Sequence, residues 1–155
     1  MSELEDGFGF LIHDIARQIT TAFDERLKSY NMTRSNWRAI LYIWRTPGIT
    51  QTELSDILDL SRMGVTGLID RMEDKGLVCR KDDARDRRIK RIYLTESTAE
   101  LMPLINKLGQ ELVDDLFRDF SDSDRKRTFR LLLRVKDNGF SLLYEDTGKE
   151  AKNRG

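Results

Sequence analysis

Residues 61–95 read SRMGVTGLIDRMEDKGLVCRKDDARDRRIKRIYLT, and this stretch decides the fold. Ser61 suits the N-cap position of a helix. Four apolar residues then recur at helical spacing and share one face: Val65, Leu68, Ile69 and Met72. Gly76 ends the helix, and residues 77–80 and 89–95 read as two strands separated by a polar loop. The stretch predicts a helix followed directly by a β-hairpin. On the second strand three apolar residues are expected to face one way: Ile89, Ile92 and Leu94.

A second short helix is expected just before this one. Thr50, with Glu53 three residues later, makes a capping box for residues 51–58. Its buried stripe is expected to be Leu54, Ile57 and Leu58. Two short helices joined by a few residues form a helix-turn-helix, and a β-hairpin directly behind it is a wing. Gly64 and Gly67 each cost about 1 kcal/mol relative to alanine in a helix. Close approach to a partner favours their retention, whereas an ordinary amphipathic surface helix does not need them.

Positive charge is concentrated between the two predicted strands. The whole chain balances 27 Lys and Arg against 27 Asp and Glu, yet residues 80–91 hold seven cations and three aspartates, a local excess of +4. A positive patch on an otherwise acidic chain favours an anionic polymer such as nucleic acid, and a solvated charged loop is the alternative. Three arginines crowd the hairpin tip and suit a narrow minor groove: Arg85, Arg87 and Arg88. Asp86 precedes Arg88 by two residues and can hold its guanidinium in a bidentate pose.

The remaining chain is predicted to be helical. Four further helices are expected: residues 8–29 with a stop at Asn31, residues 34–45 capped by Thr33, residues 96–120 capped by Thr95, and one that starts between Ser121 and Ser123 and runs to Glu145. The second of these is expected to turn four residues inward: Trp37, Ile40, Leu41 and Trp44. Pro103 is expected to bend the third. The apolar stripes at both ends of the chain exceed what the central lobe can cover. This excess indicates that the terminal helices pack against those of a second copy of the chain.

The predicted fold class is mainly α with a small β-hairpin wing. In this order of elements the chain resembles the MarR family of transcription regulators. The resemblance is carried by VTGLIDRMEDKGLVCR (65–80) and DDARDRRIKRIYLT (82–95), in which Asp86, Arg88, Ile92, Leu94 and Thr95 match the wing signature of the family. Ala84 departs from the pattern, because many members have proline there. The resemblance implies a homodimer on a pseudo-palindromic double-stranded DNA operator, with half-sites about 34–36 Å apart.

The same resemblance implies the division of the chain and its DNA contacts. Residues 1–155 would be a single MarR-type domain, with a winged helix-turn-helix DNA-binding lobe at 33–95 and dimerisation helices at 8–30 and 96–146. The expected DNA contacts lie in the helix-turn-helix and the wing: Gln51, Thr52, Arg62, Met63, Gly64, Thr66, Gly67, Arg71, Arg85, Asp86, Arg87 and Arg88. Repression is the commoner outcome in the family, although the sequence does not distinguish it from activation.

Control by a small aromatic or phenolic ligand is a further expectation from the family. Five residues of the first two helices are candidates for its pocket: His13, Arg17, Trp37, Arg38 and Tyr42. Each has a plainer alternative, since Trp37 suits the core and the arginines suit the surface. Cys79 falls on a wing strand and is interpreted as a small hydrophobe rather than a redox sensor. With one histidine in the chain, no metal site and no cofactor are expected.

Other functional classes are disfavoured by the sequence. It contains no glycine-rich phosphate loop, no Ser-His-Asp order and no metal-ligand cluster, so no catalytic residues and no enzyme activity are expected. Its apolar runs are far shorter than the roughly 20 residues of a membrane span. A single cysteine and an acidic N-terminus without signal-peptide features predict a cytoplasmic protein. A winged-helix regulator without a ligand, or a winged helix that binds protein, is the alternative function.

Overall fold

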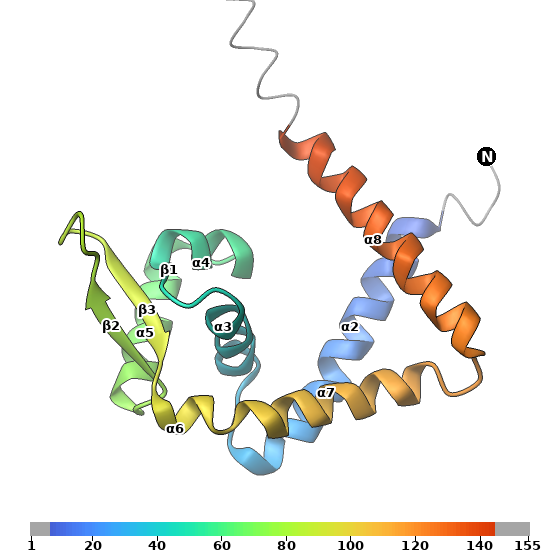
Figure 1. The fold of residues 1–155 in the computed structure, drawn as a ribbon, viewed down its shortest axis with the longest axis horizontal. Coiled ribbons are helices and arrows are strands. Elements are labelled where there is room, and N and C mark those ends of the chain that lie inside the picture. Colours follow the sequence, from blue (N-terminus) through green and yellow to red (C-terminus); the bar gives the residue numbers. More distant parts are fainter. Residues whose placement is uncertain (1–6, 145–155) are drawn as a thin grey trace, which may run out of the picture. The chain divides into compact units, whose positions relative to one another are not determined.

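The computed structural model describes residues 7–144, and Figure 1 shows its helices and strands. The elements in chain order are α2 (Phe8–Leu27), the 3-10 helix η1 (Lys28–Tyr30), α3 (Arg34–Arg45), β1 (Ile49–Thr50), α4 (Gln51–Leu58), α5 (Arg62–Asp74), β2 (Val78–Asp82), β3 (Lys90–Leu94), α6 (Glu96–Ala99), α7 (Met102–Leu116) and α8 (Asp122–Tyr144). The chain forms two compact units that divide between Leu112 and Val113. The observed mixture of helices and a small antiparallel sheet confirms the predicted fold class.

Helix starts in the first unit follow the capping residues expected from the sequence. The side chain of Thr33 accepts from the backbone N–H of Asn36, and that of Ser61 accepts from Gly64. Thr50 and Glu53 form both halves of a capping box, with 2.8 Å from the Thr50 nitrogen to Glu53 Oε2. These hydrogen bonds lower the pKa of Glu53. Since each cap satisfies N–H groups that a helix cannot satisfy itself, these local residues determine where the helices begin.

The sheet of the first unit has three antiparallel strands in the order β1-β3-β2. Strands β2 and β3 pair from Val78 opposite Leu94 to Asp82 opposite Lys90, and β1 pairs Ile49 with Ile92. We call this β2–β3 hairpin the wing and its connection, residues 83–89, the wing loop. Strand β2 runs two residues further than the predicted end at residue 80. Ile89 lies outside β3 and is exposed, so its predicted alignment with Ile92 was wrong.

A single apolar core holds the helix-turn-helix, the base of the wing and parts of α2 and α7 together. Its fully buried members include Leu27, Ile40, Ile43, Leu54, Val65, Ile69, Met72, Val78, Ile92 and Ile105. Two predicted core residues, Trp44 and Ile57, are instead exposed at 46% and 41%. In α3 the inner face runs through Ile40 and Ile43, which turns Trp44 outward. The helical spacing identified an apolar face correctly and assigned its edges wrongly.

The predicted single helix over residues 96–120 is two helices. Thr95 caps α6 as expected, but α6 ends at Ala99 and α7 begins at Met102. Leu101 donates to Thr98 O at 3.1 Å in a tightened turn between them. Pro103 explains the break, because it has no N–H to donate and its ring disfavours a helical conformation before it. The expected bend is therefore an interruption, and α7 ends at Leu116 rather than at Phe120.

The second unit contains the end of α7 and all of α8. Ser121 Oγ accepts from the Asp124 nitrogen at 3.1 Å, so α8 starts where the sequence placed it, while the predicted end at Glu145 lies outside the described residues. The ring of Phe117 stacks on that of Phe129 with centroids 5.3 Å apart. Apolar side chains remain exposed along α8: Leu131, Leu132, Leu133, Val135, Phe140 and Leu142. Within residues 7–144, no helix has the length and apolar character that crossing a membrane requires.

Candidate nucleic-acid interface

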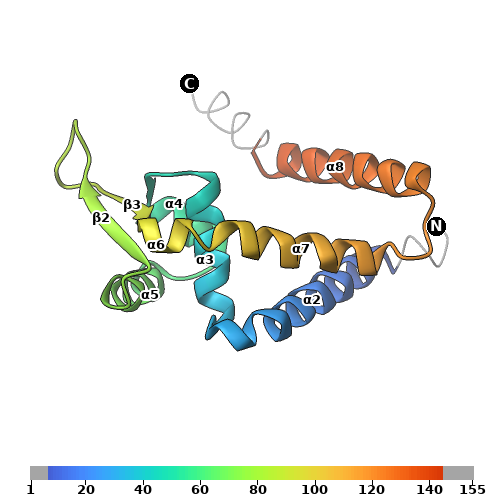
Figure 2. The same cartoon turned by 60° about the horizontal axis from the view of Figure 1, so that its bottom comes forward.

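Helix α5 presents one face to the core and the opposite face to solvent. Its four inward residues are buried to 3% exposure or less: Val65, Leu68, Ile69 and Met72. This burial fixes the rotation of the helix. Four of the expected contact residues therefore face outward: Arg62, Met63, Thr66 and Arg71. Met63 is 85% exposed. Figure 2 shows α5 beside the base of the wing, so both elements expected to contact DNA belong to one unit.

The two glycines of α5 have different environments. A Cβ atom on Gly64 would lie 3.2 Å from Ser61 Oγ, the atom that caps the helix. Contact with the capping side chain of Ser61 therefore favours glycine at position 64. A Cβ on Gly67 would approach only the end of the Arg71 side chain, at 3.3 Å from Nη1, and that flexible group can move aside. Packing among the described residues thus explains Gly64. It does not explain Gly67, for which close approach to a partner is the remaining interpretation.

The start of α4 is joined to the exposed face of α5 by a side-chain hydrogen bond. Gln51 Nε2 donates to Thr66 Oγ1 at 3.1 Å, and Thr66 Oγ1 donates to the carbonyl of Arg62 at 2.9 Å. The Thr66 hydroxyl therefore both accepts and donates within the protein. Gln51 is half-buried and Thr52 is exposed at the N-terminus of α4, a position at which backbone amides favour an anion.

Asp83 organises the wing loop, and no role was predicted for it from the sequence. Asp83 Oδ1 accepts from the backbone nitrogens of Arg85 at 2.8 Å and Asp86 at 3.1 Å. Its other oxygen accepts from Arg91 Nε. The Arg85 amide, the Arg91 guanidinium and the Asp86 amide together lower the pKa of Asp83 to about 2. An aspartate that accepts from backbone nitrogens two and three residues later closes a tight turn, and that spacing is visible in the sequence.

Asp86 holds Arg88 as the sequence predicted. Arg88 Nε lies 3.0 Å from Asp86 Oδ1, and Arg88 Nη2 lies 2.8 Å from Oδ2. The Arg88 side chain, followed by the Arg88 backbone amide, lowers the pKa of Asp86. The Arg88 side chain remains 90% exposed despite this bidentate contact. Arg88 is therefore oriented and still accessible, which limits the rotamer entropy that it would lose on binding.

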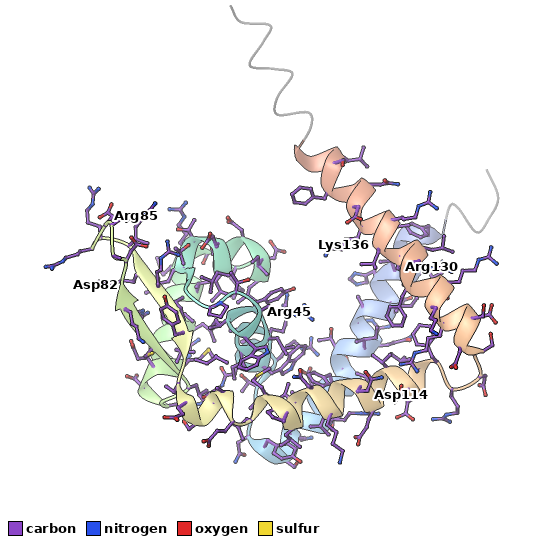
Figure 3. The ribbon with its side chains drawn as sticks, in the orientation of Figure 1. Arg45, Asp82, Arg85, Asp114, Arg130 and Lys136 are labelled. Atoms are coloured by element: carbon purple, nitrogen blue, oxygen red, sulfur yellow. The ribbon has the colours of Figure 1, made fainter. Side chains whose placement is uncertain are left out.

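Most of the seven cations of residues 80–91 have partners within the chain. Arg80, Arg88, Lys90 and Arg91 form ion pairs with carboxylates, and Lys81 lies over the Tyr93 ring at 5.1 Å. Among the described residues, Arg85 and Arg87 form no ion pair and lie in the wing loop. Figure 3 shows Arg85 at the end of the wing, directed away from the sheet. The free positive charge of this stretch is therefore concentrated at the tip of the wing.

Two of the paired arginines connect the wing to other parts of the first unit. Arg80 Nη2 lies 2.6 Å from Asp70 Oδ1, and Arg80 Nη1 lies 2.7 Å from Glu73 Oε2, so one guanidinium on β2 joins two carboxylates of α5. Arg91 Nη1 donates to the carbonyl of Gly48 at 2.9 Å. Neither connection was predicted from the sequence, because both depend on the register of the strands rather than on local spacing.

The residues expected to line a ligand pocket lie on α2 and α3. His13 and Arg17 are exposed, and Arg17 pairs with Asp14 at 3.1 Å. Trp37 is 9% exposed and contacts Phe23 edge to face at 4.9 Å. Its Nε1 donates to Asp24 at 2.7 Å, so its polar group already has a partner. Arg38 and Tyr42 are partly exposed.

Cys79 lies on β2 opposite Tyr93 and is partly exposed. Across residues 7–144, no cluster of three or more His, Cys, Asp or Glu side chains is arranged to hold a metal ion.

Comparisons with known proteins show which family and which solved structures this chain resembles. Residues 30–89, which span α3 to the wing loop, match the family model described as the MarR family. Over these residues the chain is similar to the MarR family. A solved MarR transcriptional regulator from Methanosarcina mazei Go1 is similar with a TM-score of 0.80 and 27% identity over 88% of this chain and 99% of that one. A MarR-family regulator from Listeria monocytogenes, solved with 26mer DNA, is similar with a TM-score of 0.75 and 25% identity over 96% of both chains.

A curated relative points the same way. An uncharacterised HTH-type transcriptional regulator of Bacillus subtilis, YybA, is 24% identical over 124 residues, which cover 80% of this chain and 83% of that protein. The matched family and the similar fold are those of winged-helix transcriptional regulators rather than of enzymes.

Proposed function

We propose that this protein is a MarR-family homodimer that binds a pseudo-palindromic DNA operator in a sequence-specific manner and represses transcription there. In each protomer α5 enters a major groove and the wing loop reaches the adjacent minor groove. The observation that carries the proposal is the pairing of an exposed α5 face with a wing tip whose free charges are Arg85 and Arg87. The similar Listeria protein that was solved with 26mer DNA supports duplex DNA as the partner.

The apolar surfaces of the two units support the homodimer. In the first unit α2 exposes apolar side chains between residues 8 and 19: Phe8, Phe10, Leu11, Ile15 and Ile19. In the second unit α8 does the same with Phe129, Leu132, Phe140 and Leu142 among others. Exposed apolar surface of this extent marks an interaction site. We propose that residues 8–30 and 96–146 form the dimer and that residues 33–95 form the DNA-binding lobe.

Binding measured across a salt series tests the DNA part of the proposal. Each phosphate neutralised by an Arg or Lys contributes about −0.9 to the slope of log K against log salt. A dimer that uses Arg85, Arg87 and Arg88 of both protomers should therefore lose affinity steeply between low and physiological salt. A winged helix that binds protein would show no such slope and no duplex binding in dilute buffer. Light scattering on the purified protein tests the dimer, and a stable monomer would refute it.

We propose, on the family resemblance, that a small aromatic or phenolic acid releases the DNA. The candidate contacts remain His13, Arg17, Trp37, Arg38 and Tyr42. Because Trp37 Nε1 already donates to Asp24, its part would be a ring contact rather than a hydrogen bond. Titration of the DNA complex with salicylate-like and cinnamate-like acids tests this control. Release by one of them supports it, and an unchanged complex across the panel argues for a regulator without a small-molecule effector.

A further inference from the structure

An apolar surface lies on the face of α5 that is expected to meet the bases. Met63 occupies the first turn of α5 and is 85% exposed, more than any other large hydrophobic residue of residues 7–144. Thr66 follows one turn later on the same face and is also exposed. The N-terminal residues of a recognition helix are those that contact base edges. Contact of this methionine with an apolar group in the complex would remove apolar surface from water and so would stabilise the complex.

The hydrogen bonds of Thr66 determine what this residue can offer to DNA. Its hydroxyl accepts from Gln51 Nε2 and donates to the Arg62 carbonyl. A threonine whose hydroxyl is used in this way has chiefly its methyl group left for a new contact. Thr66 therefore adds to the apolar surface of Met63 rather than to the polar contacts of the helix. We call these two groups the apolar reading patch.

The partner of such a patch follows from the chemistry of the major groove. The edges of the base pairs present hydrogen-bond donors and acceptors there, and the apolar group among them is the 5-methyl of thymine. Gly67 lies beside Thr66, and its environment permits close approach of the backbone. We propose that the apolar reading patch, Met63 with the Thr66 methyl, selects operators by contact with thymine 5-methyl groups. This inference rests on the proposed binding of DNA by α5.

A comparison of thymine with deoxyuridine tests the inference directly. The duplex is one that the protein itself selects from a random double-stranded library, synthesised once with thymine and once with deoxyuridine in its place. The exchange removes only the methyl in the major groove and leaves base pairing and the minor-groove edge unchanged, so the wing meets the same surface. Burial of one methyl corresponds to about a fourfold change in affinity. The parent protein should bind the thymine duplex tighter by about fourfold per methyl contacted.

Matched substitutions assign the preference to the patch. Met63→Ala should reduce the thymine-to-deoxyuridine ratio towards one, and Met63→Leu should retain most of it. Thr66→Val keeps the methyl and loses the hydroxyl, so the ratio should persist, whereas Thr66→Ser keeps the hydroxyl and should lower the ratio. Because both affinities are measured on the same preparation, a partly unfolded variant does not distort the ratio. Arg87→Ala, in the wing loop, is the control that should weaken both duplexes and leave the ratio at the parent value.

The possible outcomes separate this inference from the function on which it rests. Equal binding of the two duplexes by the parent protein, or an unchanged ratio in Met63→Ala, would overturn the apolar reading patch and leave DNA binding intact. A reversed order of Thr66→Val and Thr66→Ser would overturn the role of the Thr66 methyl. Failure of the parent protein to bind the thymine duplex in dilute buffer would overturn the proposed function instead.

Discussion

The face of α5 and the wing loop differ in what holds them in place. Helix α5 is fixed by an apolar stripe that includes Val65 and Ile69, both fully buried, so its outer face is free to carry any side chain that a groove requires. The wing loop has no such core and takes its shape from the carboxylates of Asp83 and Asp86. The two surfaces therefore respond to different perturbations: loss of packing for α5, and loss of negative charge for the wing loop.

This difference explains the acidic residues in a loop expected to meet DNA. Each aspartate reduces the attraction to phosphate, yet Asp83 and Asp86 order the backbone and two guanidinium groups, those of Arg91 and Arg88. A loop of arginines alone would carry more charge and would have to be ordered on binding, at a cost of roughly 1–2 kcal/mol for each residue fixed. The arrangement indicates that order in the wing loop matters more than its total charge.

The largest expected effect comes from the support of α5. Ile69→Ala removes a fully buried side chain and should lower the free energy of unfolding by about 2–5 kcal/mol. Met63→Ala on the outer face of the same helix is the matched control and should stay within about 0.5 kcal/mol of the parent protein. Chemical denaturation followed by circular dichroism measures both. Similar losses in the two variants would contradict the assignment of an inner and an outer face.

The next effect concerns a charge at the wing tip. Arg88→Ala should weaken binding to every operator by about tenfold at low salt, and the salt slope should become shallower by about one for each phosphate that is no longer neutralised. Arg118→Ala is a matched control, because Arg118 also pairs with a nearby aspartate, Asp115 at 3.4 Å, but lies in the second unit. Titrations at several salt concentrations measure both. Parent-like binding by Arg88→Ala would remove Arg88 from the interface.

A smaller effect distinguishes order from charge in the wing loop. Asp83→Asn makes the loop more positive but breaks the ion pair with Arg91, and it should weaken DNA binding by roughly twofold to fivefold if ordering dominates. Asp82→Asn makes the same change of charge one residue earlier, where the carboxylate pairs with Lys90. That control should bind as tightly as the parent or slightly tighter. Equal gains of affinity in the two variants would show that charge alone governs the wing loop.

The smallest effect is an expected absence of change with pH. The pKa of Asp83 is about 2 in the folded chain, below the value of about 3.9 for a free aspartate. A lowered folded-state pKa means that its stabilising contribution is complete above the unfolded value and is lost as pH falls towards the folded one. Carboxyl chemical shifts should therefore show no titration of Asp83 between about pH 4 and pH 8. A midpoint near that of a free aspartate would mean that the hydrogen bonds of the wing loop do not persist in solution.

Local chemistry made much of this structure predictable. The caps at Thr33, Ser61 and Thr95, the capping box of Thr50 and the bidentate pair of Asp86 and Arg88 depend on residues a few positions apart. The order of elements and the wing followed from these signals together with the apolar periodicity. The resemblance to the MarR family rested on the same residues.

The errors arose where the answer depends on residues distant in the sequence. Trp44 and Ile57 have apolar side chains at helical spacing, but the helix against which each face packs decides which positions are covered. The hydrogen bond of Arg91 to Gly48 and the ion pairs of Arg80 with α5 require the register of β2 and β3. The turn at Asp83 was not predicted, although it is a local feature: its hydrogen bonds reach only two and three residues along the chain. Pro103 was recognised, but its effect was underestimated as a bend.

The double ion pair of Arg80 has a consequence for the DNA. One guanidinium joins the wing to Asp70 and Glu73 of α5, so in the proposed complex the protein would set the separation between the groove contacts of α5 and those of the wing. Under that proposal, the duplex between those contacts would have to adopt the curvature and groove width that this separation demands. Pyrimidine–purine steps deform more easily than A-tracts, so base pairs that no side chain touches contribute to operator choice through their stiffness.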